Sequence, residues 1–179
     1  NTKTLLCNEG YGVVKYKTDN FGLRNKNSKW SNIKKQENIF IIGDSFVNGY
    51  CVPNTSTITA HVQSKKAINT LSLASGGNSP YQYKAIIRSI ISPIVNSSNY
   101  VNWVVLVFYQ NDNINFDLEE ENLLIKASPI IKNDDKGGVY PKKQYQKFIS
   151  SLIIENYPTS EEDIIKLNDI EKIRKKLKS

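Results

Sequence analysis

The sequence has no Met, one His and two Cys among its 179 residues, and each scarcity excludes something. The absence of Met predicts a processed, trimmed or partial chain. A single His excludes every site that needs two imidazoles, such as the HExxH site of zinc proteases. Two Cys, Cys7 and Cys51, exclude a four-cysteine zinc site and a disulfide framework, but they leave open one disulfide in an oxidising compartment.

Long apolar runs and arginine are scarce as well. The longest apolar run lies around residues 100–109 and is interrupted by Asn102. It is shorter than the about 20 residues that cross a bilayer, so we predict no membrane span within this chain. The net charge of +7 comes almost wholly from Lys, since Arg occurs at three positions only. Nucleic-acid readers favour the bidentate fork of Arg, and we therefore predict no nucleic-acid partner.

Three short apolar runs predict buried strands, at residues 38–42, 68–73 and 103–108. They are rich in β-branched residues and do not alternate, which is typical of a parallel sheet covered on both faces. Helix-length segments, 55–66 and 80–95, lie between them. The second has Ser79 as a cap and an apolar face that repeats every three or four residues: Tyr83, Ile86, Ile87, Ile90, Ile91 and Ile94. The order strand–helix–strand–helix–strand predicts an α/β sandwich with right-handed crossovers.

This pattern divides the chain into an N-terminal lead-in (1–37), an α/β core (38–116) and a helical extension or insertion of the same domain (117–179). In the last part, residues 133–138 predict a turn-rich loop. A helix is expected over 142–155, and another after a capping box at 160–163.

The stretch from Ile41 to Gly49, which includes Gly43-Asp44-Ser45, is the most informative for function. It follows the first predicted strand, and ligands of open α/β sheets bind at the carboxyl ends of strands. The Ser45 hydroxyl is therefore expected within reach of a ligand and near the backbone N–H groups of the turn. A plain strand-to-helix turn would use the same residue types and remains an alternative for this stretch alone.

Two further polar stretches follow the next two strands, at residues 75–80 and 109–112. Because parallel strands end at one edge of a sheet, both stretches are expected beside Ser45. Gly77 offers a backbone N–H and Asn111 a side-chain amide. A hydrolytic serine needs donors of this kind for its developing oxyanion.

The ordered set resembles the SGNH (GDSL-like) hydrolases: Gly43-Asp-Ser-Phe-Val-Asn-Gly49, then Gly77-Asn-Ser-Pro80, then Asn111-Asp112. The resemblance covers residues 11–115. It implies a flavodoxin-like three-layer α/β/α sandwich that cleaves esters without a metal or organic cofactor. It assigns Ser45 as the nucleophile, and its own N–H with Gly77 and Asn111 as the oxyanion hole. Residues 16–25 are similar to the Y-x-x-D-x-x-G-x-R-N lead-in of one bacterial subgroup.

Two departures from the family pattern matter. The third block of the family usually reads Gly-x-Asn-Asp or Gly-Asn-Asp, whereas Gln110 precedes Asn111 here, and the C-terminal Asp-x-x-His block is missing. His61 lies 16 residues after Ser45 within the first predicted helix, so we predict a surface or groove-lining role for it. Asp44 and Asp112 are expected to orient loops rather than to act as bases. The acetyltransferase relatives need an upstream Asp-x-His motif, which this chain also lacks.

The resulting hypothesis is a serine ester hydrolase acting on small acyl esters, for example O-acetylated envelope carbohydrate, with little activity in this chain alone. The alternative is a non-catalytic ligand-binding module or a decayed SGNH-fold protein. A phosphoacceptor domain with Asp44 is a weaker third. Cys51 is expected as a small buried residue, and core packing is favoured over a carbohydrate-facing role for three tyrosines, Tyr81, Tyr83 and Tyr109. The sequence leaves the compartment unknown; exported relatives favour the cell envelope or periplasm.

Overall fold

A three-stranded parallel sheet forms the centre of the computed structural model, which describes residues 3–6, 14–65, 67–110, 131–133, 135–136 and 138–141. Its strands are β3 (Asn38–Gly43), β4 (Asn69–Ala74) and β5 (Asn102–Leu106), in the order β4-β3-β5. Both pairings are parallel, with Asn38 opposite Asn69 and Asn102. The predicted α/β class and the three predicted strands are confirmed.

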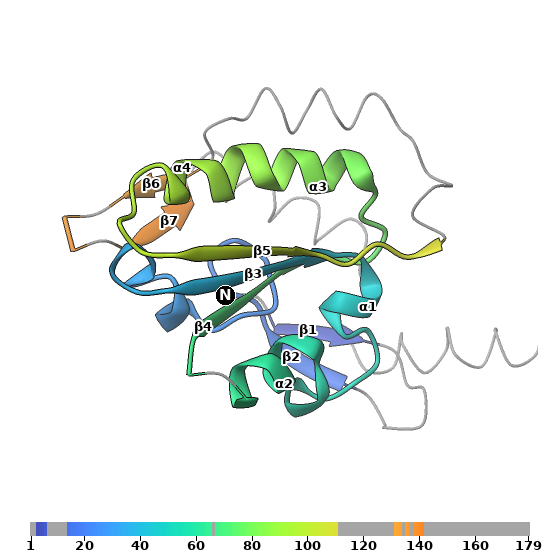
Figure 1. Cartoon of the computed structure of the whole chain (residues 1–179). Helices are drawn as coiled ribbons and strands as arrows, with labels where there is room; N and C mark the ends of the chain where they lie inside the picture. Colours follow the sequence, from blue (N-terminus) through green and yellow to red (C-terminus); the bar gives the residue numbers. More distant parts are fainter. Residues whose placement is uncertain are drawn as a thin grey trace, which may run out of the picture.

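Helices lie on both faces of this sheet (Figure 1). One face carries α2 (Ile58–Lys65), and the other carries a long helix made of α3 (Pro80–Ile86), a π-helical turn η4 (Ile87–Ile91) and α4 (Ser92–Val95). The long helix matches the segment predicted at 80–95. No helix in the described part of the chain combines the length and apolar character that a bilayer crossing requires.

The long helix begins with a capping box and changes hydrogen-bond register in its middle. Ser79 and Gln82 form the box, as reciprocal caps do at helix starts. The register change has two local causes. The hydroxyl of Ser89 donates to the carbonyl of Ala85 over 2.6 Å, and that of Ser92 donates to Ile87 over 2.9 Å. Pro93 also lacks the N–H that a regular helix would use there.

The main core lies between the sheet and the long helix. The predicted inward face is confirmed, because Tyr83, Ile90, Ile91 and Ile94 are at most 2% exposed and Ile86 and Ile87 pack against the same cluster. The lead-in contributes large side chains to this core: Phe21, Trp30 and Ile33 are buried with Phe40, Leu71 and Leu73. The rings of Phe21 and Trp30 stack with centroids 4.2 Å apart.

Two short antiparallel hairpins were not predicted. They are β1 (Lys3–Leu6) with β2 (Val14–Lys17), and β6 (Ile131–Asn133) with β7 (Val139–Pro141). Val139 of β7 is fully buried, and its N–H donates to the carbonyl of Trp30. Short 3-10 turns connect other elements: η1 (Asn27–Lys29), η2 (Ile33–Lys35) and η3 (Asn54–Ser56).

Part of the C-terminal prediction is not tested. The turn predicted at 133–138 falls between β6 and β7. The two helices predicted after residue 141 lie outside the described residues.

Strand β5 differs from the expectation of a sheet covered on both faces. β3 and β4 are largely buried, whereas the four apolar side chains from Trp103 to Leu106 are each between 43% and 51% exposed. Within the described residues β5 pairs with β3 alone and forms an edge of the sheet. A long apolar edge strand presents unpaired backbone groups to other chains and promotes association.

Replacing Val105 by Lys should therefore reduce self-association of the chain, because a charged side chain on an edge strand opposes strand addition. Val105 is 43% exposed, so we expect the free energy of unfolding to change by less than about 0.5 kcal/mol. The matched control is Val101→Lys, which adds the same charge at a 54% exposed site just before the strand. Light scattering against concentration measures the effect. Equal improvement in both variants would show that net charge, and not the β5 edge, governs association.

Candidate functional site

Ser45 lies at the carboxyl end of the middle strand of the sheet. It is the first residue of α1 (Ser45–Asn48), which starts two residues after the end of β3, and it is partly exposed. The chain leaves β3 for β4 on one side and later crosses to β5 on the other. Open α/β sheets bind ligands at such a switch in strand order. Ser45 therefore lies at a strand end, as predicted.

The residues on either side of Ser45 explain the local turn. Asp44 is buried, and its carboxylate accepts a hydrogen bond from the N–H of Phe46 over 2.9 Å, which caps α1. This is the loop-orienting role expected for Asp44. A Cβ on Gly43 would come within 2.4 Å of Cγ2 of Val47, so only glycine fits against the helix. Gly49 ends α1 in the left-handed region, at φ +75°.

The loop after β4 is hydrogen-bonded to the Ser45 turn at two points. The amide of Asn78 donates to the carbonyl of Gly43, and the amide of Asn48 donates to the carbonyl of Ala74, both over 3.1 Å. These bonds hold the ends of β3 and β4 in a fixed relation.

Gly77 and Gly76 differ in this loop. Gly77 has φ +78°, and nothing lies within 4 Å of the position that a Cβ would take. Gly76 instead faces the ring of Tyr50, 3.9 Å from such a Cβ. The open space at Gly77 agrees with the preference for Gly77 as an oxyanion donor. The donor role itself stays a prediction.

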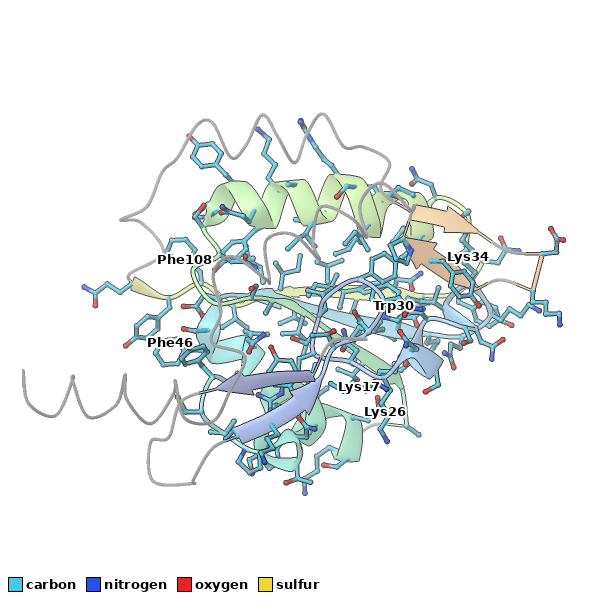
Figure 2. All side chains as sticks on the ribbon, turned by 180° about the vertical axis from the view of Figure 1, so that it is seen from behind. Lys17, Lys26, Trp30, Lys34, Phe46 and Phe108 are labelled. Atoms are coloured by element: carbon cyan, nitrogen blue, oxygen red, sulfur yellow. The ribbon has the colours of Figure 1, made fainter. Side chains whose placement is uncertain are left out.

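The third polar stretch is only partly visible. Asn111 and Asp112 lie outside the described residues, so the predicted Asn donor is not tested. The segment leading to them is described: the N–H of Val107 donates to the carbonyl of Ile42 over 2.9 Å. The rings of Tyr109 and Phe46 lie 4.3 Å apart, which brings this segment to α1. In Figure 2, Phe46 and Phe108 lie at the same end of the sheet.

Three tyrosines, Tyr81, Tyr83 and Tyr109, have different environments. Tyr83 is buried in the core, as predicted, and Tyr81 is half-buried. The expectation of core packing is wrong for Tyr109, which is 48% exposed beside the 53% exposed Phe46. An aromatic pair thus flanks the Ser45 turn on the surface.

The described residues supply no general base for Ser45. The Ser45 hydroxyl makes no hydrogen bond with any of them. His61 is exposed within α2, as predicted, and its backbone N–H bonds the carbonyl of Thr57 in the helix. The same part of the chain holds no group of three His, Cys, Asp or Glu side chains that could bind a metal ion.

Sequence reasoning matched the lead-in 16–25 to a motif but gave its residues no roles. Asp19 is buried, and its two oxygens accept four hydrogen bonds of 2.8 to 3.0 Å, from the N–H groups of Phe21 and Leu23 and from the side chains of Asn25 and Trp30. Burial raises the pKa of Asp19 above its usual value, while these donors act in the opposite direction. Asp19 therefore organises the whole turn.

Arg24 connects the lead-in to the Ser45 turn. Its guanidinium donates to the carbonyls of Asn48, Gly49 and Val52 over 3.2, 2.6 and 2.7 Å. It also donates to the side chain of Asn54 over 2.9 Å and stacks on the ring of Tyr16. The planar fork of Arg, which Lys lacks, allows this set of bonds. Arg24 thus fixes the segment that follows α1.

The side chain of Asn25 pairs with the backbone of strand β4. Its side-chain amide donates to the carbonyl of Ser72 over 2.9 Å and accepts from the N–H of Ser72 over 2.8 Å. The amide therefore satisfies both backbone groups of one β4 residue at the outer edge of the strand. Three residues of the motif, Asp19, Arg24 and Asn25, therefore have structural roles.

Cys51 is 2% exposed with φ +67° and is disulfide-bonded. Its burial was predicted, and its pairing had been left open. The other cysteine of the chain is Cys7, which lies outside the described residues.

Comparison with known proteins does not assign this site. The chain matches no family model, no curated protein and no solved structure.

Proposed function

We propose that this chain carries the nucleophile part of an SGNH-type serine ester hydrolase on a flavodoxin-like α/β/α fold. The observation that carries the proposal is the position of Ser45, partly exposed at the first turn of α1 and at the switch point of the sheet. The Gly77 loop, hydrogen-bonded to the Ser45 turn through Asn78, adds support.

In this proposal the Ser45 oxygen attacks the acyl carbonyl and forms a tetrahedral intermediate. The backbone N–H groups of Ser45 and Gly77 and the amide of Asn111 stabilise its oxyanion. A base takes the hydroxyl proton and returns it to the leaving alcohol, and water then hydrolyses the acyl-serine. The family places this base on an Asp-x-x-His block, which the sequence lacks.

The proposed substrate is a small acyl ester, for example an acetyl group on envelope carbohydrate, with no metal or organic cofactor. The exposed pair Phe46 and Tyr109 offers an aromatic surface next to Ser45 on which such a substrate can pack. The disulfide at Cys51 supports an oxidising compartment, in keeping with an envelope or periplasmic protein.

The second candidate is a non-catalytic module that binds a ligand at the same strand ends. It is favoured by one observation: among the described residues, neither His61 nor any other side chain hydrogen-bonds the Ser45 hydroxyl. A serine without a base is a poor nucleophile. The two candidates therefore differ in whether Ser45 reacts when a base is supplied.

Acylation of Ser45 tests the proposal. The 179-residue chain is incubated with p-nitrophenyl acetate, with and without imidazole as an external base, and adducts are located by peptide mass spectrometry. With imidazole we expect at least about tenfold more acetyl on Ser45 than on the exposed Ser64, because only Ser45 would have oxyanion donors. Without imidazole, turnover should be close to that of Ser45→Ala.

Ser64→Ala is the matched control and should leave the Ser45 adduct unchanged. Equal acetylation of Ser45 and Ser64 would reject the hydrolase proposal and favour the binding module. Robust Ser45-dependent turnover without imidazole would instead show that the chain already contains its base.

A further inference from the structure

A cavity of about 560 Å³ lies between strand β2, helix α2 and the loop that precedes α2, away from the Ser45 hydroxyl. Arg24 relates the two places. It lines the cavity and also binds the carbonyls of Asn48 and Gly49, at the opposite end of α1 from Ser45. The volume falls in the range of small-molecule sites and exceeds what one inorganic ion needs.

Four cationic side chains line this cavity: Lys17, Arg24, Lys26 and Lys29. None of the described residues that line it is acidic. Two of the charges are held in place by the fold, because Arg24 binds backbone carbonyls and the Lys29 ammonium donates to the carbonyl of Thr70. Burial, and then repulsion from Lys26, lowers the pKa of Lys29. The cavity therefore carries an excess of positive charge.

Lys17 and Lys26 are the two exposed cations among the residues that line the cavity. Neither ammonium forms a hydrogen bond or ion pair with another described residue, and Figure 2 shows them on the same side of the molecule, near β2. Arg24 and Lys29 are also cationic, so they cannot neutralise Lys17 and Lys26. An anion bound in the cavity would neutralise them.

The remaining wall carries neutral polar groups. Hydroxyl and amide side chains come from Asn54, Thr55, Thr59, Gln63 and Ser64. The first turn of the eight-residue helix α2 also faces the cavity, with Thr57 capping the N–H of Ala60. Hydroxyls and amides suit the hydroxyl groups of a sugar.

We propose that this cavity binds an anionic sugar, a monosaccharide unit that bears a phosphate or a carboxylate. Lys17 and Lys26 bind the anionic group, Arg24 and Lys29 provide the fixed positive field, and the polar wall contacts the sugar hydroxyls. The site is separate from the ester chemistry proposed for Ser45, and its binding can be measured whether or not Ser45 reacts.

Titration of the full chain followed by ¹H–¹⁵N NMR tests this site. The probes are glucose 6-phosphate, glucuronate, inorganic phosphate and neutral glucose. We expect at least one anionic sugar to bind saturably with a Kd below about 2 mM, and glucose not to saturate at ten times that concentration. Comparing glucose 6-phosphate with glucuronate identifies the preferred anionic group.

Lys17→Gln and Lys26→Gln should each weaken binding at least about fivefold, because each removes a charged hydrogen-bond donor. Neither ammonium holds the fold together, so both variants should stay folded. Lys35→Gln, which removes an equal charge from an exposed lysine outside the cavity, should change the Kd less than twofold.

Three results would overturn the proposal. They are the absence of saturable binding by either anionic sugar at about 20 mM, an equal loss in Lys35→Gln, and glucose binding as tightly as the charged probes. Inorganic phosphate binding as tightly as glucose 6-phosphate would overturn the sugar assignment.

Discussion

Replacing Asp19 by Ala should lower the free energy of unfolding by about 4 kcal/mol. The carboxylate is 1% exposed and accepts four hydrogen bonds, two from backbone N–H groups and two from the side chains of Asn25 and Trp30. Removing it leaves buried donors without an acceptor, each of which costs about 1 to 3 kcal/mol if water does not reach it. Urea denaturation followed by far-ultraviolet circular dichroism measures the change.

Asn20→Ala is the matched control for this substitution. The hydrogen bond from Asn20 to Asn27 is made by the backbone N–H, which Ala keeps. We expect its effect to stay within about 0.5 kcal/mol of zero. If Asp19→Ala cost no more than Asn20→Ala, the lead-in would not depend on the carboxylate. If Asp19→Ala does not fold, Trp30→Phe provides a milder test, because it removes one donor and keeps an aromatic ring at that core position.

The roles of Asp19, Arg24 and Asn25 show how a motif upstream of the Ser45 turn can act through structure alone. Asp19 closes the turn, Arg24 binds the segment after α1, and Asn25 pairs with the edge of β4. Of the three, Asn25 contacts β4 directly, and Asp19 holds Asn25 by accepting a hydrogen bond from its side-chain amide. The lead-in thus connects β4 with the segment that follows α1.

The sequence predicted the parts of the fold that have a strong local pattern. The helix over 80–95 was found because its apolar residues repeat with the helical period and Ser79 and Pro80 mark its start. The central strands were found because their apolar runs are long enough to exclude loops. The hairpins β1–β2 and β6–β7 were missed, since strands of three or four residues contain too few side chains to show alternation.

The exposure of β5 was missed for a different reason. An apolar run such as residues 102–106 indicates a strand that is suited to burial, but the pattern carries no information on which neighbours cover it. Coverage is a tertiary property, set here by the strand order β4-β3-β5. The site shows the same division: the motif located Ser45 and Gly77, whereas the charged cavity needs side chains from β2 and α2 that are far apart in sequence.

Replacing Gly43 by Ala should destabilise the chain by about 2 kcal/mol and displace Ser45. A Cβ at this position would lie 2.4 Å from Cγ2 of Val47 and 3.3 Å from the carbonyl oxygen of Val107. Val47 is fully buried against Ile41 and Ala74, so it cannot rotate away freely. The helix α1 must then move outward, and Ser45 moves with it.

Gly76→Ala is the matched control, because it adds the same methyl group in the neighbouring loop. Its Cβ would meet only the ring of Tyr50, at an ordinary contact distance of 3.9 Å, and we expect less than about 0.5 kcal/mol of change. Chemical denaturation gives the stability of both variants. Acetylation of Ser45 in imidazole gives the second readout, which should fall at least about tenfold in Gly43→Ala and stay unchanged in Gly76→Ala.

The two readouts separate a role in packing from a role in positioning. Gly43→Ala with lower stability but unchanged Ser45 acetylation would mean that α1 tolerates the shift and that the glycine serves the core alone. Loss of acetylation in a variant that is still folded at the assay temperature would mean that close contact between Gly43 and Val47 sets the position of Ser45. Because the carbonyl of Gly43 also accepts the bond from Asn78, we expect the second result: one displacement alters the turns after both β3 and β4.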